Sequence, residues 1–290
     1  MRKASLVLIF LVQLLFVQAQ QIPFRLTKHN NIVVKAVLNE KDSLHLMFHT
    51  GESDVTLIKS IIPKLQTIKF SDSVEHVGSW GSEYNTSDYS LNNTVKMAEF
   101  FIDSCTLWSD MYSGYETEGK FGMNLFKDKF VWVNFDSNCL VVSKAIPVDL
   151  SDYNKLELDD QNGLLFIKAT GVFGKNKLQH TFMIHSGYEG GLLFDDDFSG
   201  KNNLSRCVEV TDEKKFKDSF GNIISIKNAQ LDKFIVGNFN MQHIPIGFFE
   251  GGIGNQNMSV FGGALFKQFN WVFDAQRKYV YIKSSVHFKN

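Results

Sequence analysis

Two histidines stand in nearly identical tetrapeptides, Phe48–Gly51 (FHTG) and Ile184–Gly187 (IHSG), which lie about half the chain apart. In each, an apolar residue and the histidine precede a small hydroxyl residue and a glycine. A neutral imidazole offers one hydrogen-bond donor and one acceptor, and histidine titrates near neutral pH. His49 and His185, if brought together, could share a proton and act as base and acid, or they could bind a metal ion.

A metal site would need a third ligand beside the two imidazoles. His45 is the candidate, because residues four apart on one strand point to the same face. The matching place in the second half holds Thr181, so such a site would not be symmetric. Cys105, Cys139 and Cys207 show no CxxC or Cys/His spacing, and no cysteine-based zinc site is expected. One cysteine must stay unpaired, and Cys105 with Cys139 is the first disulfide to test.

Other kinds of ligand find less support in the sequence. Gly114–Phe121 (GYETEGKF) comes close to a phosphate-binding loop, but Phe121 replaces the required hydroxyl residue and two glutamates would repel phosphate. The formal net charge of −1 gives no reason to expect nucleic acid or an anionic membrane as a partner. No cofactor is expected.

The chain is an internal duplication, which sets the elements that must position the two histidines. Residues 31–57 and 162–194 both predict a strand, a turn, a second strand and then the histidine turn. Residues 121–144 and 261–283 both run Phe-Gly, a short helix-like turn, an aromatic-rich strand and a last β-branched strand. Asp136 and Asp274, which are matched by the repeat, are expected to end the aromatic-rich strands. The sequence therefore predicts two similar, mainly β lobes with short helices.

The lobes and their flanking segments have predictable limits. Residues 1–20 read as a secretory signal peptide, with a basic start, a leucine-rich run and cleavage after Ala19 or Gln20. Residues 21–148 form the first predicted lobe, 149–161 a polar and acidic linker, and 162–290 the second lobe. We expect an exported protein, periplasmic or extracellular, that is a monomer with no membrane association after signal cleavage.

This combination of paired lobes and paired turns resembles the pepsin-like aspartic proteases, above all their exported bacterial members with simple, retropepsin-like lobes. The resemblance covers nearly all of the predicted mature chain. It implies a two-lobed double β-barrel. In that family each lobe carries Asp-Thr-Gly or Asp-Ser-Gly, and the two aspartates activate a water molecule against a peptide carbonyl. Here His49 and His185 stand at both aspartate positions.

The resemblance also implies roles for the neighbouring residues. Thr50-Gly51 and Ser186-Gly187 match the family, in which the hydroxyls hydrogen-bond across the lobes and fix the two loops. Phe121-Gly122 and Phe261-Gly262 match the apolar-Gly element that crosses behind each loop. The flap that closes over substrate corresponds to residues 78–84, with Trp80 or Tyr84 as the aromatic residue at its tip.

Loss of both aspartates leaves four alternatives for function. The first is an inactive homologue that keeps a cleft for a peptide or an unfolded protein segment, in which Thr50, Gly51, Trp80, Tyr84, Ser186 and Gly187 would contact the ligand. The second is a peptidase in which His49 and His185 replace the acid pair. The third is the metal site, and the fourth is a purely structural role. Two protonated imidazoles repel each other, so acidic conditions should suit any chemistry at this site badly.

Overall fold

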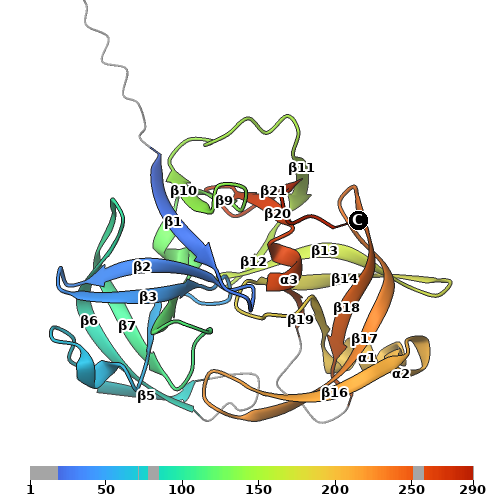
Figure 1. Ribbon diagram of the computed structural model, residues 1–290, viewed down its shortest axis with the longest axis horizontal. Coiled ribbons are helices and arrows are strands. Elements are labelled where there is room, and N and C mark those ends of the chain that lie inside the picture. The colour runs from blue at the N-terminus through green and yellow to red at the C-terminus, as the bar shows by residue number, and fades with distance from the viewer. Residues whose placement is uncertain (1–18, 71, 78–84, 251–257, 290) are drawn as a thin grey trace, which may run out of the picture.

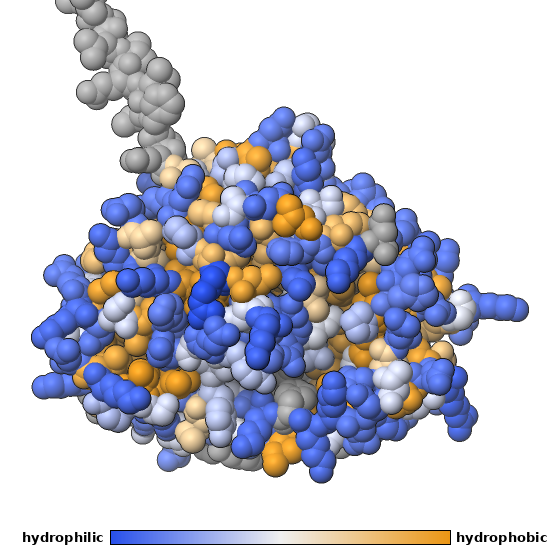
Figure 2. All heavy atoms as spheres, in the orientation of Figure 1, coloured by the Kyte–Doolittle hydropathy of each residue, from blue (hydrophilic) through white to orange (hydrophobic). Residues whose placement is uncertain are grey.

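The computed structural model describes residues 19–70, 72–77, 85–250 and 258–289. It is mainly β, as predicted, with two barrels side by side and a set of shared strands along one side of them (Figure 1). Hydrophilic side chains predominate on the face drawn in Figure 2, where hydrophobic ones gather only in small patches. No helix within the described ranges is both long and apolar enough to cross a bilayer.

The first barrel follows the strand order β1-β2-β3-β8-β4-β7-β6-β5, and a further β2–β6 pairing closes it. Side chains alternate between core and solvent, as along β3, where Leu44 and Leu46 are buried while Ser43 and His45 are exposed. The elements are β1 Gln20–Leu26, β2 Ile32–Leu38, β3 Asp42–Phe48, β4 Val55–Ile58, β5 Asp72–Val77, β6 Asn85–Met97, β7 Phe100–Asp110 and β8 Gly119–Phe121, with the 3-10 helices η1 Ile62–Lys64 and η2 Met123–Phe126.

The second barrel follows the order β12-β13-β14-β19-β15-β18-β17-β16, and a β13–β17 pairing closes it. Phenylalanines fill its core, including Phe182, Phe194 and Phe261, which have no exposed surface. The elements are β12 Asp159–Gln161, β13 Leu164–Phe173, β14 Asn176–His185, β15 Leu192–Phe194, β16 Val210–Lys217, β17 Ile223–Val236, β18 Phe239–Phe248 and β19 Ser259–Gly262, with helices α1 Asp196–Lys201, α2 Leu204–Cys207 and α3 Gly263–Phe266.

A shared sheet joins the lobes in the order β11-β21-β20-β9-β10-β1. Its strands are β9 Phe130–Asn134, β10 Cys139–Ser143, β11 Asn154–Glu157, β20 Phe269–Phe273 and β21 Tyr279–Ser284. The two aromatic-rich repeat strands pair with each other here, because β9 and β20 run antiparallel with Val272 opposite Trp132. The repeat thus packs against its own copy.

The aspartates that follow these strands stabilise turns. The Asp136 carboxylate accepts a hydrogen bond from the Val286 amide at 2.7 Å, and that of Asp274 accepts one from the Tyr279 amide at 2.9 Å. Both residues therefore satisfy backbone donors where the chain leaves the sheet.

Two expectations concern the segments that flank the predicted lobes. Residues 1–18 of the predicted signal peptide lie outside the described residues, and β1 begins at Gln20, next to the predicted cleavage point. Within the predicted linker 149–161, β11 pairs with β21 and β12 pairs with β13, so this segment is hydrogen-bonded into both sheets.

The suggested disulfide between Cys105 and Cys139 is not formed. All three thiols are free, with Cys105 and Cys139 buried and Cys207 exposed. Cys105 lies on β7 and Cys139 on β10, and even by the shorter way round the closed barrel three strands (β6, β2 and β1) separate β7 from β10. Two cysteines can be bridged only when their Cα atoms are within about 7 Å, which this separation does not allow.

Candidate active-site cleft

Three paired strands, β3, β8 and β4, position the loop that carries His49. β3 runs parallel to β8, and β8 runs antiparallel to β4. The His49 amide donates to the Phe121 carbonyl at 2.9 Å, and the Gly122 amide donates to the Asp54 carbonyl at 3.0 Å. A Cβ atom on Gly122 would lie 1.8 Å from the Glu52 carbonyl oxygen, so only glycine fits at this crossing.

His185 is held in the same way in the second lobe. β14 runs parallel to β19 with His185 opposite Gly262, and β15 pairs antiparallel with β19. The Gly262 amide donates to the Gly191 carbonyl at 2.7 Å. A Cβ atom on Gly262 would lie 2.5 Å from the Gly190 carbonyl oxygen. The two matched Phe-Gly elements thus occupy equivalent places behind the two histidine loops.

The loops interlock through the hydroxyl residues that follow the histidines. The Thr50 amide donates to Ser186 Oγ at 3.1 Å, and the Ser186 amide donates to Thr50 Oγ1 at 3.0 Å. Each hydroxyl in turn donates to a carbonyl of the opposite lobe, Thr50 to Ile184 at 2.6 Å and Ser186 to Phe48 at 2.7 Å. Thr50 and Ser186 have no exposed surface. These four bonds form the inter-lobe arrangement that the resemblance implied for Thr50 and Ser186.

The two imidazoles meet where the loops interlock. Their ring centroids are 4.5 Å apart and the ring planes are inclined by 70°, an edge-on arrangement. The His49 ring also covers the glycine of the opposite loop, since a Cβ atom on Gly187 would lie 2.1 Å from His49 Cδ2. A Cβ atom on Gly51 would lie 3.1 Å from His49 Cε1. The glycines make room for rings that are larger than carboxylates.

Hydrogen bonds assign one tautomer. The Tyr188 amide donates to His185 Nδ1 at 2.9 Å, so neutral His185 carries its proton on Nε2. His49 Nδ1 is buried and has no hydrogen-bond partner among the residues that the structure describes.

Both imidazoles are neutral near pH 7. Burial lowers the pKa of His185 to about 4, and the positive charge of Lys120 contributes to that shift. Burial, His185 and Lys120 together hold the pKa of His49 well below 6.5. Desolvation penalises the charged form of each ring, and neighbouring positive charge adds to the penalty. The pair therefore lacks the shared acidic proton of two adjacent carboxyl groups.

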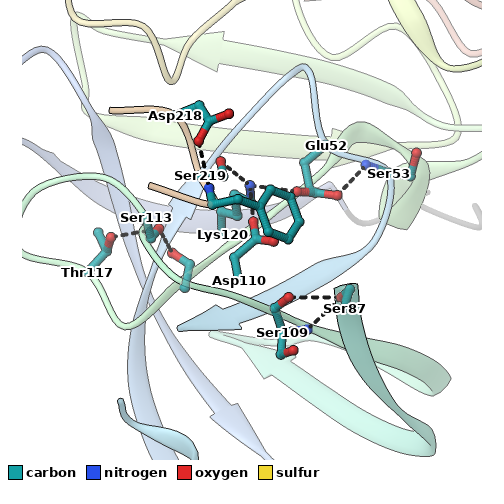
Figure 3. Close-up of polar contacts among 12 residues, drawn as sticks. Glu52, Ser53, Ser87, Ser109, Asp110, Ser113, Thr117, Lys120, Asp218 and Ser219 are labelled. Carbon is teal, nitrogen blue, oxygen red and sulfur yellow. Dashed lines mark hydrogen bonds and ion pairs between the residues drawn. The ribbon is translucent and has the colours of Figure 1, made fainter. Parts of the chain in front are cut away.

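A buried lysine lies in the same cleft, and no sequence motif marks it as a site residue. Lys120 on β8 points its ammonium at Asp110 Oδ2 (2.6 Å), Glu52 Oε2 (3.1 Å) and Ser219 Oγ (3.0 Å) (Figure 3). Burial alone would lower the pKa of Lys120, but Glu52 and Asp110 raise it above the ordinary value. The sequence signal for this lysine is the GYETEGKF segment, whose pattern suggests a phosphate loop rather than an ion-pair cluster.

A cleft of about 1510 Å³ separates the lobes, with both histidines in its lining. Aromatic and apolar side chains from both lobes share the lining, among them Trp108, Tyr115 and Met183. Thr50 and Ser186, the interlocking residues of the loops, are fully buried and do not line the cleft. The predicted flap residues Trp80 and Tyr84 lie outside the described residues.

His45 does not join the two cleft histidines. β3 ends at Phe48, so His49 lies in the following turn and the strand's alternation does not carry over to it. His45 is half-exposed and lies 3.7 Å from Glu118. No cluster of three or more His, Cys, Asp or Glu side chains suited to a metal ion occurs within the described ranges.

Comparisons with known proteins support the fold. No protein-family model matches the chain, and no curated protein sequence matches it. Among solved structures, the chain is similar to an aspartic proteinase from Irpex lacteus, with a TM-score of 0.59 over 93% of this chain and 98% of that chain. The identity is 12%, so the likeness concerns the fold alone. The predicted two-lobed, pepsin-like architecture is confirmed.

Proposed function

We propose that this protein is a non-catalytic relative of the aspartic proteases that binds an extended peptide, or an unfolded protein segment, in its cleft. The observation that carries the proposal is the pair of neutral imidazoles at the place where the interlocked loops meet. The structure keeps the parts that position the two loops, while the groups there cannot supply an ionised carboxylate beside a protonated one.

The dimensions and lining of the cleft favour a chain-like ligand. A cleft of about 1510 Å³ is larger than the ~300–1,000 Å³ of sites for small molecules. Tyr115, which is 56% exposed and lines the cleft, offers an aromatic contact of the kind that dominates peptide recognition. Export and a monomeric state remain part of the proposal.

Binding is tested with fluorescein-labelled casein, an unfolded chain, by fluorescence anisotropy. Tyr115→Ala is expected to weaken binding at least ~5-fold, because tyrosines are enriched among the contact residues whose truncation costs more than about 1 kcal/mol. Tyr279→Ala is the matched control, since that tyrosine is 36% exposed on β21 and does not line the cleft. No binding by the wild-type protein to casein or to a broad peptide array would refute the proposal.

The same probe tests catalysis, because cleavage of labelled casein releases small fluorescent peptides. We expect no cleavage by the wild-type protein from pH 3 to pH 8. Robust cleavage that His49→Ala abolishes would instead show a working histidine pair. The double substitution His49→Asp with His185→Asp asks whether the cleft still supports the acid pair, and newly gained proteolysis would show that only the dyad was lost.

A further inference from the structure

The hairpin of β16 and β17 reaches across the cleft from the second lobe. Its tip is a well-bonded turn, in which the Asp218 amide donates to the Asn222 carbonyl at 3.0 Å. The Asp218 carboxylate accepts from the amides of Phe220 at 3.0 Å and Asn222 at 2.8 Å. These contacts give the tip a defined shape independent of the first lobe.

This tip is hydrogen-bonded to the first lobe mainly through Ser219, and Asn222 Nδ2 also donates to Asn85 Oδ1 at 3.3 Å. The Ser219 carbonyl accepts from the amides of Met111 at 3.0 Å and Tyr112 at 2.9 Å. Its hydroxyl accepts from Lys120 Nζ at 3.0 Å (Figure 3). Nearby, Lys217 Nζ lies 5.5 Å from the centre of the Tyr112 ring. The cleft is therefore bridged at the hairpin tip as well as at the interlocked loops.

The other connections between the lobes are more extensive. The loops share four buried hydrogen bonds, and β9 pairs with β20 in the shared sheet. Arg277 adds hydrogen bonds from the second lobe to the carbonyls of Lys129 at 2.9 Å and Phe126 at 3.0 Å. The hairpin tip is the smaller and more exposed of these bridges, so it is the one that can release without disturbing the core.

Release of the tip would leave no buried charge uncompensated. Glu52 and Asp110 belong to the first lobe, as Lys120 does, so both ion pairs persist when the hairpin moves away. On release, the hydrogen bonds of Ser219 with Lys120, Met111 and Tyr112 would pass to water, as would that of Asn222 with Asn85. An arrangement of this kind permits an open and a closed state that differ by few interactions.

We propose that the β16–β17 hairpin is a latch, which closes the cleft by docking Ser219 on the Lys120 cluster and must open to admit or release an extended chain. The proposal rests on the proposed peptide-binding function, because it concerns access to the same cleft. Asp218, Ser219 and Phe220 line that cleft together with the two histidines. A bound chain would pass between the latch and the histidine loops.

Hydrogen exchange of the Met111 and Tyr112 amides tests the latch without any ligand. These amides donate to Ser219, so they exchange only when the tip releases. Ser219→Ala removes the hydroxyl acceptor of Lys120, and hydrogen bonds to charged groups are strong enough to predict exchange about 10- to 100-fold faster. Ser225→Ala, at an exposed serine of β17 in the same hairpin, is the matched control and should leave the exchange unchanged.

The outcomes separate the latch from the peptide-binding function. Equal exchange in the wild type and in Ser219→Ala, or wild-type amides that exchange as fast as an unstructured peptide, would overturn the latch. With labelled casein in stopped-flow, Ser219→Ala should bind and dissociate faster than the wild type and Ser225→Ala. Unchanged rates would refute the gating role, whereas no casein binding by any of them would refute the peptide-binding function and leave the latch to be decided by hydrogen exchange.

Discussion

Replacing His185 with glutamine tests whether the two cleft imidazoles are neutral. Burial lowers the pKa of His185 from an ordinary 6.5 to about 4. Between these values the unfolded chain binds a proton that the folded protein does not, so the free energy of unfolding falls as the pH falls from about 6.5 to about 4. Above pH 6.5 His185 is neutral in both the folded and the unfolded protein, so it has no effect on stability. Below about pH 4 it is protonated in both, so the loss of stability has reached its full size.

The size of the effect follows from the same pKa. Each pH unit of difference is worth about 1.4 kcal/mol, which gives about 3 kcal/mol for a ring shielded from water throughout. Because His185 lines the cleft and is only partly buried, water screens its charge, and we expect about 2 kcal/mol. Glutamine can still accept from the Tyr188 amide but does not titrate.

The assay is urea unfolding of the wild type and of His185→Gln at several pH values from 7 to 4. Acid lowers the stability of both proteins through their carboxylates, so the informative quantity is the difference between them. Relative to the variant, the wild type should lose about 2 kcal/mol over this range. His45→Gln removes a half-exposed imidazole outside the cleft and is the control, so its plot of unfolding free energy against pH should run parallel to that of the wild type. Parallel curves for His185→Gln would refute the neutral pair.

Three further substitutions test the packing around the loops by urea unfolding at pH 7. Gly187→Ala should lower the free energy of unfolding by about 2 kcal/mol or more, because the added Cβ atom would overlap the His49 ring. Gly200→Ala is the control and should be neutral or slightly stabilising, since no atom lies within 4 Å of a Cβ atom there. Equal effects of the two substitutions would contradict the close contact between Gly187 and His49. Thr50→Val should lower the free energy of unfolding by about 2–4 kcal/mol, because it removes the side-chain partner of the Ser186 amide and of the Ile184 carbonyl in the opposite loop. A loss below ~1 kcal/mol would argue against the interlock. Lys120→Met should lower the free energy of unfolding by about 3–5 kcal/mol at pH 7, because it leaves the carboxylates of Glu52 and Asp110 uncompensated, and by less near pH 5. A loss of stability that does not depend on pH would contradict the ion pairs.

The duplicated half-chains made the fold and the two loops predictable. A repeated strand-turn-strand pattern constrains both lobes at once, and the paired Phe-Gly elements identify which segments cross behind His49 and His185. The interlock of Thr50 with Ser186 was implied by the resemblance to the aspartic proteases, in which the matching hydroxyls hydrogen-bond across the lobes.

The Lys120 cluster could not be predicted from local patterns. Its members Glu52, Asp110 and Ser219 come from separate segments, and Ser219 belongs to the other lobe. Neither strand alternation nor the repeat indicates how far a hairpin extends over a cleft, since that depends on tertiary packing. The prediction that His45 faces the same side as His49 was wrong, because the strand that carries His45 ends at Phe48, one residue before His49.

The exchange of hydrogen bonds between Thr50 and Ser186 has a consequence for the order of folding. Each loop obtains its donors and acceptors from the other half of the chain, more than 130 residues away. Contacts over such sequence separations form after the entropy of closing a long loop has been overcome, so they should be absent from the early steps. Weakening them should leave the folding rate nearly unchanged and speed unfolding instead. The loops that carry the two histidines would then determine how long the native protein persists rather than how quickly it forms.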